Sequence, residues 1–402
     1  MGCNTSSTNK ISDVGVASTN NKTTLPPIIE TKEEEKNDIE EEAVVDNNQI
    51  QEKEEQEAVA QLKVPTPKQS RGPTPVSIAS DTDYTSNRLL LLGSAESGKT
   101  TLLEQVRVLY KQHFTDSEIY HRRSFIYHNI FKSIKCLVKA MKDGRLEYED
   151  PINRGRAQLI EMDTDGHYGL FTKGMVENIK HIWNDAAVQR LYERRSTFNL
   201  NDSTAYFLGK IDKINTIDYM PSGNDLIMSY VPTIGVQNVV FSARNQTFQL
   251  FDIGGHQIDR RKWATQYDGI DAIFFCLAIS EYDQVMNEDM TTNRFDDALR
   301  LLQQINQEPK FENTPIYLFL NEVDVFCEKL QVIPLQKYIE GFQGGDSDDA
   351  LDFMESLAVA SLSGRDKSLY RVYRCIAIDT QMMSEILSVV FKDIMKRKKK
   401  KN

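Results

Sequence analysis

Residues 89–100 read Leu89-Leu-Leu-Leu-Gly93-Ser-Ala-Glu-Ser-Gly98-Lys-Thr100, an apolar run that stops at a glycine-rich loop. A helical pattern begins directly after the loop, so these residues predict a strand, a phosphate-binding loop and the start of a helix. The spacing is GxxxxGK[ST], in which the two glycines let the backbone approach polyphosphate oxygens closely. We expect Lys99 to reach the β and γ phosphates and the Thr100 hydroxyl to face Mg²⁺. The alternative is an ordinary strand-to-helix turn that carries these residues by chance.

The composition indicates a soluble chain with room for two domains of ordinary size. It has 402 residues, of which 40% are apolar, enough to bury a sizeable core. No apolar run approaches the roughly 18 residues that cross a bilayer, and the first residues lack the apolar core of a signal peptide, so we expect a protein that is not secreted. The five cysteines show no CxxC pair and no histidine at zinc-ligand spacing, which favours the reducing cytosol over a disulfide framework.

Acidic residues are concentrated in the first 87 residues. This segment carries 16 Asp and Glu against 8 Lys and Arg, so it holds −8 of the net charge of −11. Ser, Thr, Asn, Glu, Gln and Pro dominate it. Because such a composition cannot bury enough apolar surface to offset the entropy lost on ordering, we predict a mostly disordered acidic tail over residues 1–87. The remainder holds only −3, which argues against nucleic acid as a partner.

Both ends of the chain carry signals for membrane association. Met1-Gly-Cys-Asn-Thr-Ser6 matches M-G-x-x-x-[ST], in which Gly2 accepts myristate, and Cys3 is available for palmitate. Two acyl chains hold firmly where one binds weakly, so we expect anchoring at the cytoplasmic face of the plasma membrane, although so short a pattern also occurs by chance. The basic run Lys396-Arg-Lys-Lys-Lys-Lys401 is either a solvated helix end or an added attraction to anionic lipid of about 1 kcal/mol per charge.

A long helical block separates the phosphate loop from the other predicted strands. After a helix predicted over 101–113, apolar residues recur at steps of three and four, which is typical of an amphipathic core helix. This stripe consists of Phe125, Ile126, Ile130, Phe131, Ile134, Leu137, Val138 and Met141. Shorter helical patterns follow at 174–185, 187–194 and 204–214. We predict that residues 114–221 form an inserted all-helical domain that can lie over the nucleotide.

Strand patterns resume after the helical block. Val236 to Ala243 and Thr247 to Phe251, joined by a polar turn, predict a hairpin. Apolar runs at 272–279, 316–320 and 372–378 alternate with helical segments, which is typical of a parallel sheet covered on both faces. Each run ends in a polar loop, and ligands of such folds bind at the carboxyl ends of the strands. We therefore predict an α/β domain formed by residues 88–113 and 222–402.

Three further motifs near these strands suit a nucleotide. Asp252-Ile-Gly-Gly255 places a carboxylate near the metal and a glycine pair where a backbone N–H can sense the γ-phosphate. Thr233, ahead of the hairpin, can supply a second hydroxyl to Mg²⁺. Asn321-Glu-Val-Asp324 offers a carboxylate that accepts two hydrogen bonds from the N1 and 2-amino groups of guanine, a donor pair that adenine lacks. Each motif alone is common by chance, but the set in this order is specific.

The set resembles the alpha subunits of heterotrimeric G proteins over about residues 88–395. GSAESGKT, the helical insertion, PTIGV, DIGGHQIDRRKW, NEVD and the terminal IAIDT follow the family's order. The resemblance implies a Ras-like P-loop GTPase domain with an inserted helical domain, Mg²⁺, GTP or GDP as ligand, and a switch near 252–267 held by an ion pair of Arg260 with Asp297. It implies a beta-gamma dimer and a G-protein-coupled receptor as partners. The nucleotide-binding residues it implies are Gly93, Ser94, Ala95, Glu96, Ser97, Gly98, Lys99, Thr100, Thr101, Asp202, Ser203, Thr233, Asp252, Gly255, Asn321, Glu322, Asp324 and Ala377, with Thr100 and Thr233 at the metal.

Three departures from the family fall on its hydrolytic positions. Tyr230 stands where the family has the arginine of its first switch, and a phenol cannot present a delocalised positive fork to the γ-phosphate. His256 replaces the glutamine that positions water, and Ala95 replaces the third glycine of the phosphate loop. The sequence therefore predicts that nucleotide binding is retained while GTP hydrolysis is slow or absent, with His256 and Tyr230 as degenerate catalytic positions.

Other departures weaken the base contact and the partner motifs. Glu322 replaces a lysine whose stem lies on the guanine ring. The basic run at the C-terminus replaces the tail that contacts receptors, and the arginine-rich start of the family's N-terminal helix is not recognisable. We therefore expect weakened coupling to a receptor and to a beta-gamma dimer, and the sequence identifies no effector.

Three other interpretations of the sequence stay open. The protein can be a working GTPase in which His256 replaces the glutamine and another group supplies positive charge. It can be an interaction scaffold that binds nucleotide for stability alone and signals through its acidic tail. A P-loop kinase is disfavoured, because the NEVD motif has no purpose there and no site for an acceptor substrate is visible.

Overall fold

The computed structural model describes residues 86–401 apart from His113, Asn199, Pro232, Ile234 and Asn287. The predicted acidic tail, with Gly2 and Cys3, therefore lies outside the described residues except for its last two positions. Within the described part of the chain, no helix is both long and apolar enough to cross a membrane.

Six strands form one sheet in the order β2-β3-β1-β4-β5-β6. They are β1 (Asn87–Gly93), β2 (Val236–Ala243), β3 (Gln246–Ile253), β4 (Ala272–Ala278), β5 (Ile316–Asn321) and β6 (Tyr370–Arg374). β2 and β3 form the predicted antiparallel hairpin, and every other neighbouring pair is parallel. The predicted α/β sheet with a hairpin at one edge is thus confirmed.

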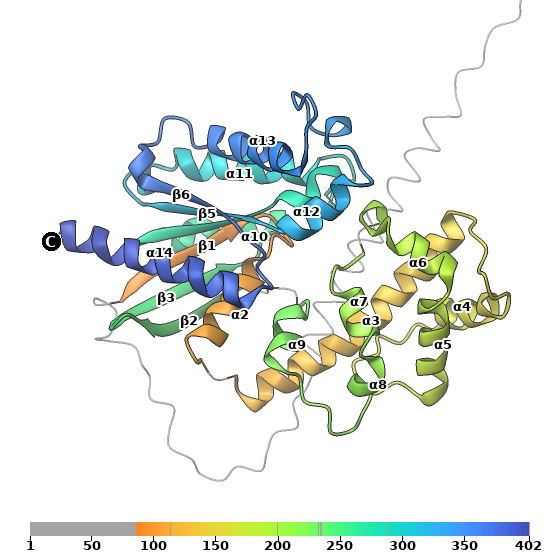
Figure 1. Cartoon of the computed structure of the whole chain (residues 1–402). Helices are drawn as coiled ribbons and strands as arrows, with labels where there is room; N and C mark the ends of the chain where they lie inside the picture. The colour runs from red at the N-terminus through yellow and green to blue at the C-terminus, as the bar shows by residue number, and fades with distance from the viewer. Residues whose placement is uncertain are drawn as a thin grey trace, which may run out of the picture. The chain divides into compact units, whose positions relative to one another are not determined.

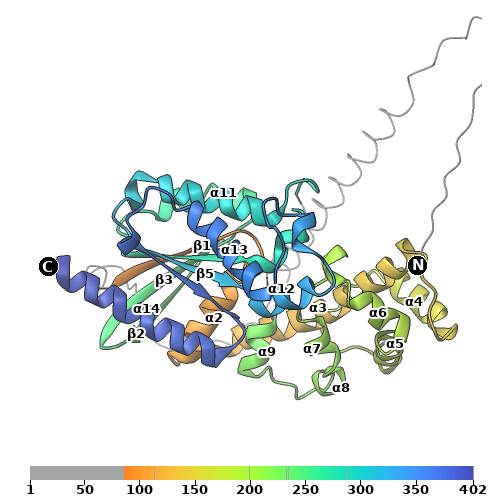
Figure 2. The same ribbon diagram turned by 45° about the horizontal axis from the view of Figure 1, so that its top comes forward.

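Helices cover both faces of this sheet, and β1 shows how. Successive side chains of a strand point to opposite faces. Leu90 and Leu92 pack in one core with residues of α11 and α13, whereas Leu89 and Leu91 pack in a second core with residues of α2 and α14. Figures 1 and 2 show α11 and α13 on one side of the sheet and α14 on the other. The four helices are α2 (Lys99–Leu109), α11 (Arg294–Gln307), α13 (Ser347–Ala360) and α14 (Thr380–Lys401).

Short elements complete the connections of the sheet. The α-helices are α10 (Gln257–Arg260) and α12 (Val323–Leu330). The 3-10 turns are η2 (Trp263–Gln266), η3 (Ile279–Asp283), η4 (Pro309–Phe311), η5 (Leu335–Lys337) and η6 (Lys367–Leu369).

The predicted helical block is present between α2 and β2. Its elements are α3 (Asp116–Asp143), α4 (Ile152–Met162), α5 (Lys173–Trp183), α6 (Ala186–Tyr192), η1 (Arg195–Phe198), α7 (Thr204–Leu208), α8 (Ile211–Ile214) and α9 (Gly223–Met228). All eight residues of the predicted apolar stripe are buried on α3, and seven of them join one hydrophobic cluster with side chains of α4 to α8. This cluster is separate from the two cores of the sheet. The limits of the inserted domain at 114 and 221 stay a prediction.

Some predicted element ends were wrong. The helix expected to continue to residue 113 ends at Leu109, and Lys111 then adopts a left-handed φ of 52°. The helical pattern 204–214 is divided into α7 and α8 at Gly209. The last strand ends at Arg374 although the apolar run extends to residue 378. Beyond it, the backbone N–H of Ala377 bonds to the side chain of Asn321.

Candidate nucleotide-binding site

The phosphate loop joins β1 to α2 and depends on two glycines. Gly93 has a φ of 146° and Gly98 a φ of 88°, backbone angles that side chains disfavour. A Cβ on Gly93 would lie 2.2 Å from the carbonyl oxygen of Cys276 in β4, and a Cβ on Gly98 would lie 2.2 Å from the side chain of Asn321 after β5. The loop is therefore confined between the ends of two neighbouring strands, at the carboxyl edge of the sheet where the sequence predicts it.

Lys99 is buried at the first turn of α2, and its ammonium turns back into the loop. Nζ donates a hydrogen bond to the carbonyl oxygen of Ser94. Burial lowers the pKa of Lys99, while the Asp252 carboxylate acts in the opposite direction. Gly255 lies so close that a Cβ there would be 2.5 Å from Nζ. Ser94 Oγ is buried with no hydrogen-bond partner among the described residues. A phosphate anion would satisfy both the cation and the hydroxyl.

Three oxygen-bearing side chains meet beside the loop. Thr100 Oγ1 lies 2.7 Å from Thr233 Oγ1 and donates to Oδ2 of Asp252 at 2.9 Å. Asp252 is fully buried near the end of β3, and its Oδ1 has no hydrogen-bond partner in the described part of the chain. Burial raises the pKa of Asp252 to about 6, although Lys99 acts to lower it. Oxygen ligands with an unmet acceptor fit Mg²⁺, which when bound supplies positive charge to the phosphate oxygens.

We expect Asp252→Asn to stabilise the protein free of nucleotide and Mg²⁺ near neutral pH. The folded pKa of about 6 lies above the ordinary value of 3.8, so this carboxyl contributes stability below the ordinary value and loses it as the pH rises through 6. At about pH 7.5 the buried charge costs up to about 3 kcal/mol, a cost that Asn avoids. Urea unfolding at about pH 5 and pH 7.5 measures the difference, with the exposed Asp296→Asn as control. A lower free energy of unfolding for D252N at the higher pH would contradict the prediction.

Asn321 connects three segments at the expected base end of the site. Its Oδ1 accepts a hydrogen bond from the backbone N–H of Ala377 at 2.8 Å, and its Nδ2 donates to the carbonyl oxygen of Ser97 at 3.3 Å. Gln105 of α2 donates to the carbonyl oxygen of Ala377 at 2.8 Å. The loop after β6 is thereby held against the phosphate loop. Asp324 is exposed on the first turn of α12, where its carboxylate is available to the donor pair of a guanine.

Glu322 does not take the place of the lysine stem that the family lays on the base. Its backbone is left-handed, with a φ of 66°, and its carboxylate accepts a hydrogen bond from Ser280 Oγ in η3. Burial raises the pKa of Glu322 well above its ordinary value. The Glu322 side chain is directed to Ser280 and not to the base site, so Asn321 and Asp324 remain the residues predicted to contact the base.

The segment after Asp252-Ile-Gly-Gly255 is held by two of its own side chains, which hydrogen-bond to the backbone of the preceding glycines. Trp263 Nε1 donates to the carbonyl oxygen of Gly254 at 3.0 Å, and Arg260 Nε donates to that of Gly255 at 2.9 Å. The guanidinium of Arg260 also makes the expected ion pair with Asp297 of α11, with both nitrogens bonded to the carboxylate. Trp263 is buried, so its fluorescence should report on the conformation of this segment.

The three positions predicted to be degenerate for hydrolysis lie in different segments. The carbonyl oxygen of Tyr230 accepts a hydrogen bond from Asn129 of α3 at 2.9 Å. Ala95 in the phosphate loop and His256 at the start of α10 share the wall of one small cavity. Glu288 lies beside His256 on this wall, with 3.2 Å between Glu288 Oε1 and His256 Nδ1. The sequence analysis missed Glu288, because nothing in its local sequence connects it to a histidine 32 residues away.

Arg294 is a second residue of this region that the sequence analysis missed. It is buried at the start of α11 and pairs with Glu96 of the phosphate loop and with Glu281 of η3. Burial raises the pKa of Glu96, but Arg294 outweighs that and holds the pKa below its ordinary value. The charged Glu96 thus ties the phosphate loop to α11. No motif marked Arg294, because its role depends on two carboxylates distant in sequence.

The helical block contributes Asp202 and Ser203 near the base end. Arg195 of η1 pairs with Asp202 at 3.5 Å and makes two hydrogen bonds to Glu328 of α12, at 3.0 and 2.8 Å. Ser203 Oγ donates to Asn201 within its own loop at 2.7 Å. The Arg195 contacts therefore join the loop before α7 to the helix that carries Asp324, whereas Ser203 makes a local contact.

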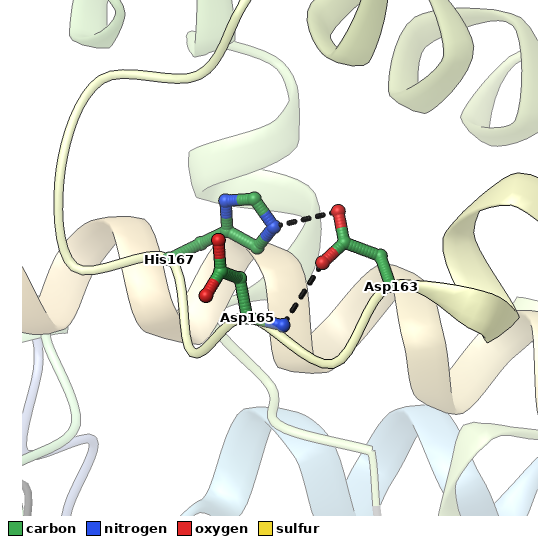
Figure 3. A group of neighbouring side chains, drawn as sticks. All are labelled: Asp163, Asp165 and His167. Carbon is green, nitrogen blue, oxygen red and sulfur yellow. Dashed lines mark hydrogen bonds and ion pairs between the residues drawn. The ribbon is translucent and has the colours of Figure 1, made fainter.

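Asp163, Asp165 and His167 form a separate group of side chains that could ligate a metal, in the loop after α4 (Figure 3). His167 Nε2 lies 2.9 Å from Asp163 Oδ2, and Asp163 Oδ1 accepts from the backbone N–H of Asp165 at 2.9 Å. Burial raises the pKa of Asp163, but these bonds outweigh that and hold it below its ordinary value. Lys135 donates to the carbonyl oxygen of Asp163 at 2.8 Å. The internal bonds explain the arrangement, and we assign it a structural role in the loop.

Comparison with known proteins shows the family of this chain. A family model described as G-protein alpha subunit matches residues 25–395. The guanine nucleotide-binding protein alpha-13 subunit of Caenorhabditis elegans is 70% identical over 85% of this chain and 98% of its own length, and that of Caenorhabditis briggsae is 70% identical over 84% and 97%. The alpha-1 subunit of C. elegans is 33% identical over 80% and 92%. This chain therefore belongs to the family of G-protein alpha subunits, which bind guanine nucleotides and transduce signals.

Proposed function

We propose that this protein is a guanine-nucleotide switch that binds GTP or GDP with Mg²⁺, hydrolyses GTP slowly or not at all, and acts at the cytoplasmic face of the plasma membrane. One contrast carries the proposal. The positions expected to bind phosphate, metal and base lie close together, and each presents a group suited to its ligand. Lys99, Thr100 and Asn321 are examples. The hydrolytic positions, by contrast, hold Tyr230 and His256, neither of which presents the family's groups.

A nucleotide-dependent change in Trp263 fluorescence tests whether the protein is a switch. The indole bonds to Gly254, and Gly255 lies against Lys99, so a γ-phosphate near Lys99 would act on the segment that carries Trp263. We expect the emission to differ between the complexes with GDP and with a non-hydrolysable GTP analogue. Trp183, in α5, is the second tryptophan, and Trp183→Phe isolates the signal. Equal emission in the two complexes would favour the alternative, a nucleotide-stabilised interaction scaffold that does not cycle.

A receptor and a beta-gamma dimer are proposed as partners of weakened affinity. The family membership supports them, while the basic run after Met395 and the acidic N-terminal segment depart from the family's contact sequences. The effector is not identified by any residue of the site.

Membrane attachment is expected to depend on Gly2 and Cys3 together. Gly2→Ala removes the acceptor for myristate, and Cys3→Ser removes the acceptor for palmitate, which leaves at most one weakly binding chain. Each variant should move from the membrane pellet to the supernatant after cell fractionation, with Thr5→Ala, at an unconstrained position of the motif, as a control for the N-terminal sequence. If Gly2→Ala protein still pellets with membranes, the anchor lies elsewhere, for example in the basic run 396–401.

A further inference from the structure

His256 and Glu288 form a hydrogen-bonded pair at the phosphate loop. His256 is the N-cap residue of α10, and Glu288 lies in the loop that leads into α11. The distance from His256 Nδ1 to Glu288 Oε1 is 3.2 Å, and the side chains are 33% and 22% exposed. Both residues are therefore partly shielded from solvent, where a carboxylate–imidazole bond is stronger than at a free surface. The pair joins two segments that are separated in the chain by strand β4 and its connections.

The loop that presents Glu288 is braced by its own backbone. The N–H of Met286 donates to the carbonyl oxygen of Thr292 at 2.8 Å, which closes the loop at its base. The carboxylate of Asp289 accepts from the N–H groups of Thr291 and Thr292 at 3.0 and 2.8 Å. Arg294 Nε donates to the carbonyl oxygen of Val285 at 3.1 Å. These hydrogen bonds hold the loop that carries Glu288 beside His256, and a carboxylate held in this way can orient the imidazole ring.

A small cavity connects this pair to the phosphate loop. Its volume is about 10 Å³, close to the least that holds a single water molecule. The lining residues are Ser94, Ala95, His256, Arg260, Met286, Glu288, Arg294 and Asp297. The wall therefore includes the phosphate loop on one side and the histidine–carboxylate pair on the other. A water held between them would be next to the terminal phosphate of a nucleotide bound in the loop.

We propose that His256 is the base that activates the hydrolytic water in this protein and that Glu288 is its positioning residue, so that the pair provides slow hydrolysis in place of the family's glutamine. Glu288 accepts a hydrogen bond from Nδ1–H, which selects the tautomer whose Nε2 can take a proton. This inference rests on the proposed function, since it requires GTP in the loop.

The proposed step balances as an ordinary hydrolysis. The water oxygen forms a bond to the γ-phosphorus, and the bond from that phosphorus to the β–γ bridging oxygen breaks, with its electron pair leaving on GDP. One proton of the water passes to Nε2 of His256, which becomes an imidazolium stabilised by the Glu288 carboxylate, and then returns to solvent. The hydrogen bond to His256 holds the pKa of Glu288 below its ordinary value, so the carboxylate keeps its charge throughout.

The charged groups around His256 come from each element packed near it. Glu96 of the phosphate loop acts on His256 through its charge, and it is in turn near Lys132 of α3. The remaining charged groups of the cavity wall are Arg260 of α10, Glu288, and Arg294 and Asp297 of α11. Arg294 is paired with Glu96, and Arg260 with Asp297, so Glu288 is the carboxylate bonded directly to the ring.

Single-turnover hydrolysis of GTP bound to the full chain with Mg²⁺ tests the proposal. His256→Ala should lower the rate by about 100-fold, the low end for loss of a general base. Glu288→Ala should lower it by about 10-fold, and Glu288→Gln, which keeps an acceptor for Nδ1–H, should lose less. Because Glu288 acts only through His256, the double variant should be no slower than His256→Ala alone. The exposed Asp296→Ala removes a nearby carboxylate and should leave the rate unchanged.

Two further measurements separate positioning from a merely structural role. The wild-type rate should rise with pH as His256 loses its proton, and the His256→Ala rate should not. Nitrogen-15 NMR of the neutral histidines should place the His256 proton on Nδ1 in wild type, and should show a mixture of the Nδ1–H and Nε2–H tautomers in Glu288→Ala.

Several results would overturn the proposal. A Glu288→Ala rate equal to or above wild type, or a wild-type proton on Nε2, excludes the positioning role. If the protein binds GTP and Mg²⁺ but shows no hydrolysis, the role of His256 as a base is excluded, while the proposed switch function stands. Failure to bind GTP at all excludes the proposed function itself, which direct titration detects before any rate is measured.

Discussion

Tyr230→Arg together with His256→Gln is expected to raise single-turnover GTP hydrolysis by at least two orders of magnitude, and by more than either change alone. Phosphoryl transfer needs positive charge on the equatorial oxygens of the γ-phosphate and a water held in line. Lys99 and a bound Mg²⁺ would supply part of the charge, but the phenol of Tyr230 would supply none. Ala95 adds a methyl group to the wall where the water would lie.

The expected magnitude follows from what an arginine does in this family. In this family it contributes a factor of about 10³ to 10⁵ in rate. That factor corresponds to about 4 to 7 kcal/mol of transition-state stabilisation. Wild-type turnover should accordingly fall well below the ~10⁻² s⁻¹ of family members that carry their own arginine.

Tyr230→Phe is the matched control for this experiment, because it changes the side chain without adding charge and should leave the rate near that of wild type. Nucleotide affinity should be measured for every variant, so that a loss of binding is not read as a loss of hydrolysis. If wild type already hydrolyses GTP at the family rate, or if the double variant is no faster, the missing groups have substitutes and the slow-switch proposal is wrong.

Asp324→Asn is expected to weaken GTP binding by about 100- to 1,000-fold while leaving ATP binding, already weak, nearly unchanged. The carboxylate would accept two hydrogen bonds from guanine, and each charge-assisted bond contributes about 1.5 to 3 kcal/mol. Asn keeps one acceptor but presents an N–H group to one of the guanine donors. The variant should therefore gain affinity for xanthosine triphosphate, whose base has an oxygen in place of the 2-amino group.

Lys99→Ala separates base recognition from phosphate binding. Removal of its buried ammonium should weaken the binding of all triphosphates, whatever their base, because the charge would face the phosphates bound in the loop. Competition titrations of GTP, ATP and xanthosine triphosphate against both variants give the comparison. Equal affinity of wild type for GTP and ATP would exclude the assignment of Asn321 and Asp324 to the base.

Much of the fold was predictable because its signals are local. The four leucines of β1 are an unbroken apolar run, and such runs are typical of strands covered on both faces. The stripe on α3 has the period of a helix with one buried face, and the structure buries all of it. The GxxxxGK[ST] spacing likewise carries its structural reason within eight residues.

Element ends were less predictable, because they depend on partners distant in sequence. The apolar run at 372–378 continues past the end of β6, and nothing within it marks Arg374 as the last strand residue. Beyond that end, the backbone N–H of Ala377 bonds to the side chain of Asn321, at the end of the neighbouring strand β5. This tertiary contact fixes the position of the Ala377 backbone.

The sequence alone determined the fold family and the spacing of the phosphate loop, because both rest on residue types at short, regular spacing. It also predicts the base-recognition motif and the loss of hydrolytic groups at Tyr230 and His256. Only the tertiary structure decided that Glu288 lies against His256 and that Arg294 ties Glu96 to α11. Such pairs join residues 32 and 198 positions apart. Their spacing follows no period, because it is the packing of loops at the end of the sheet that brings the charges together.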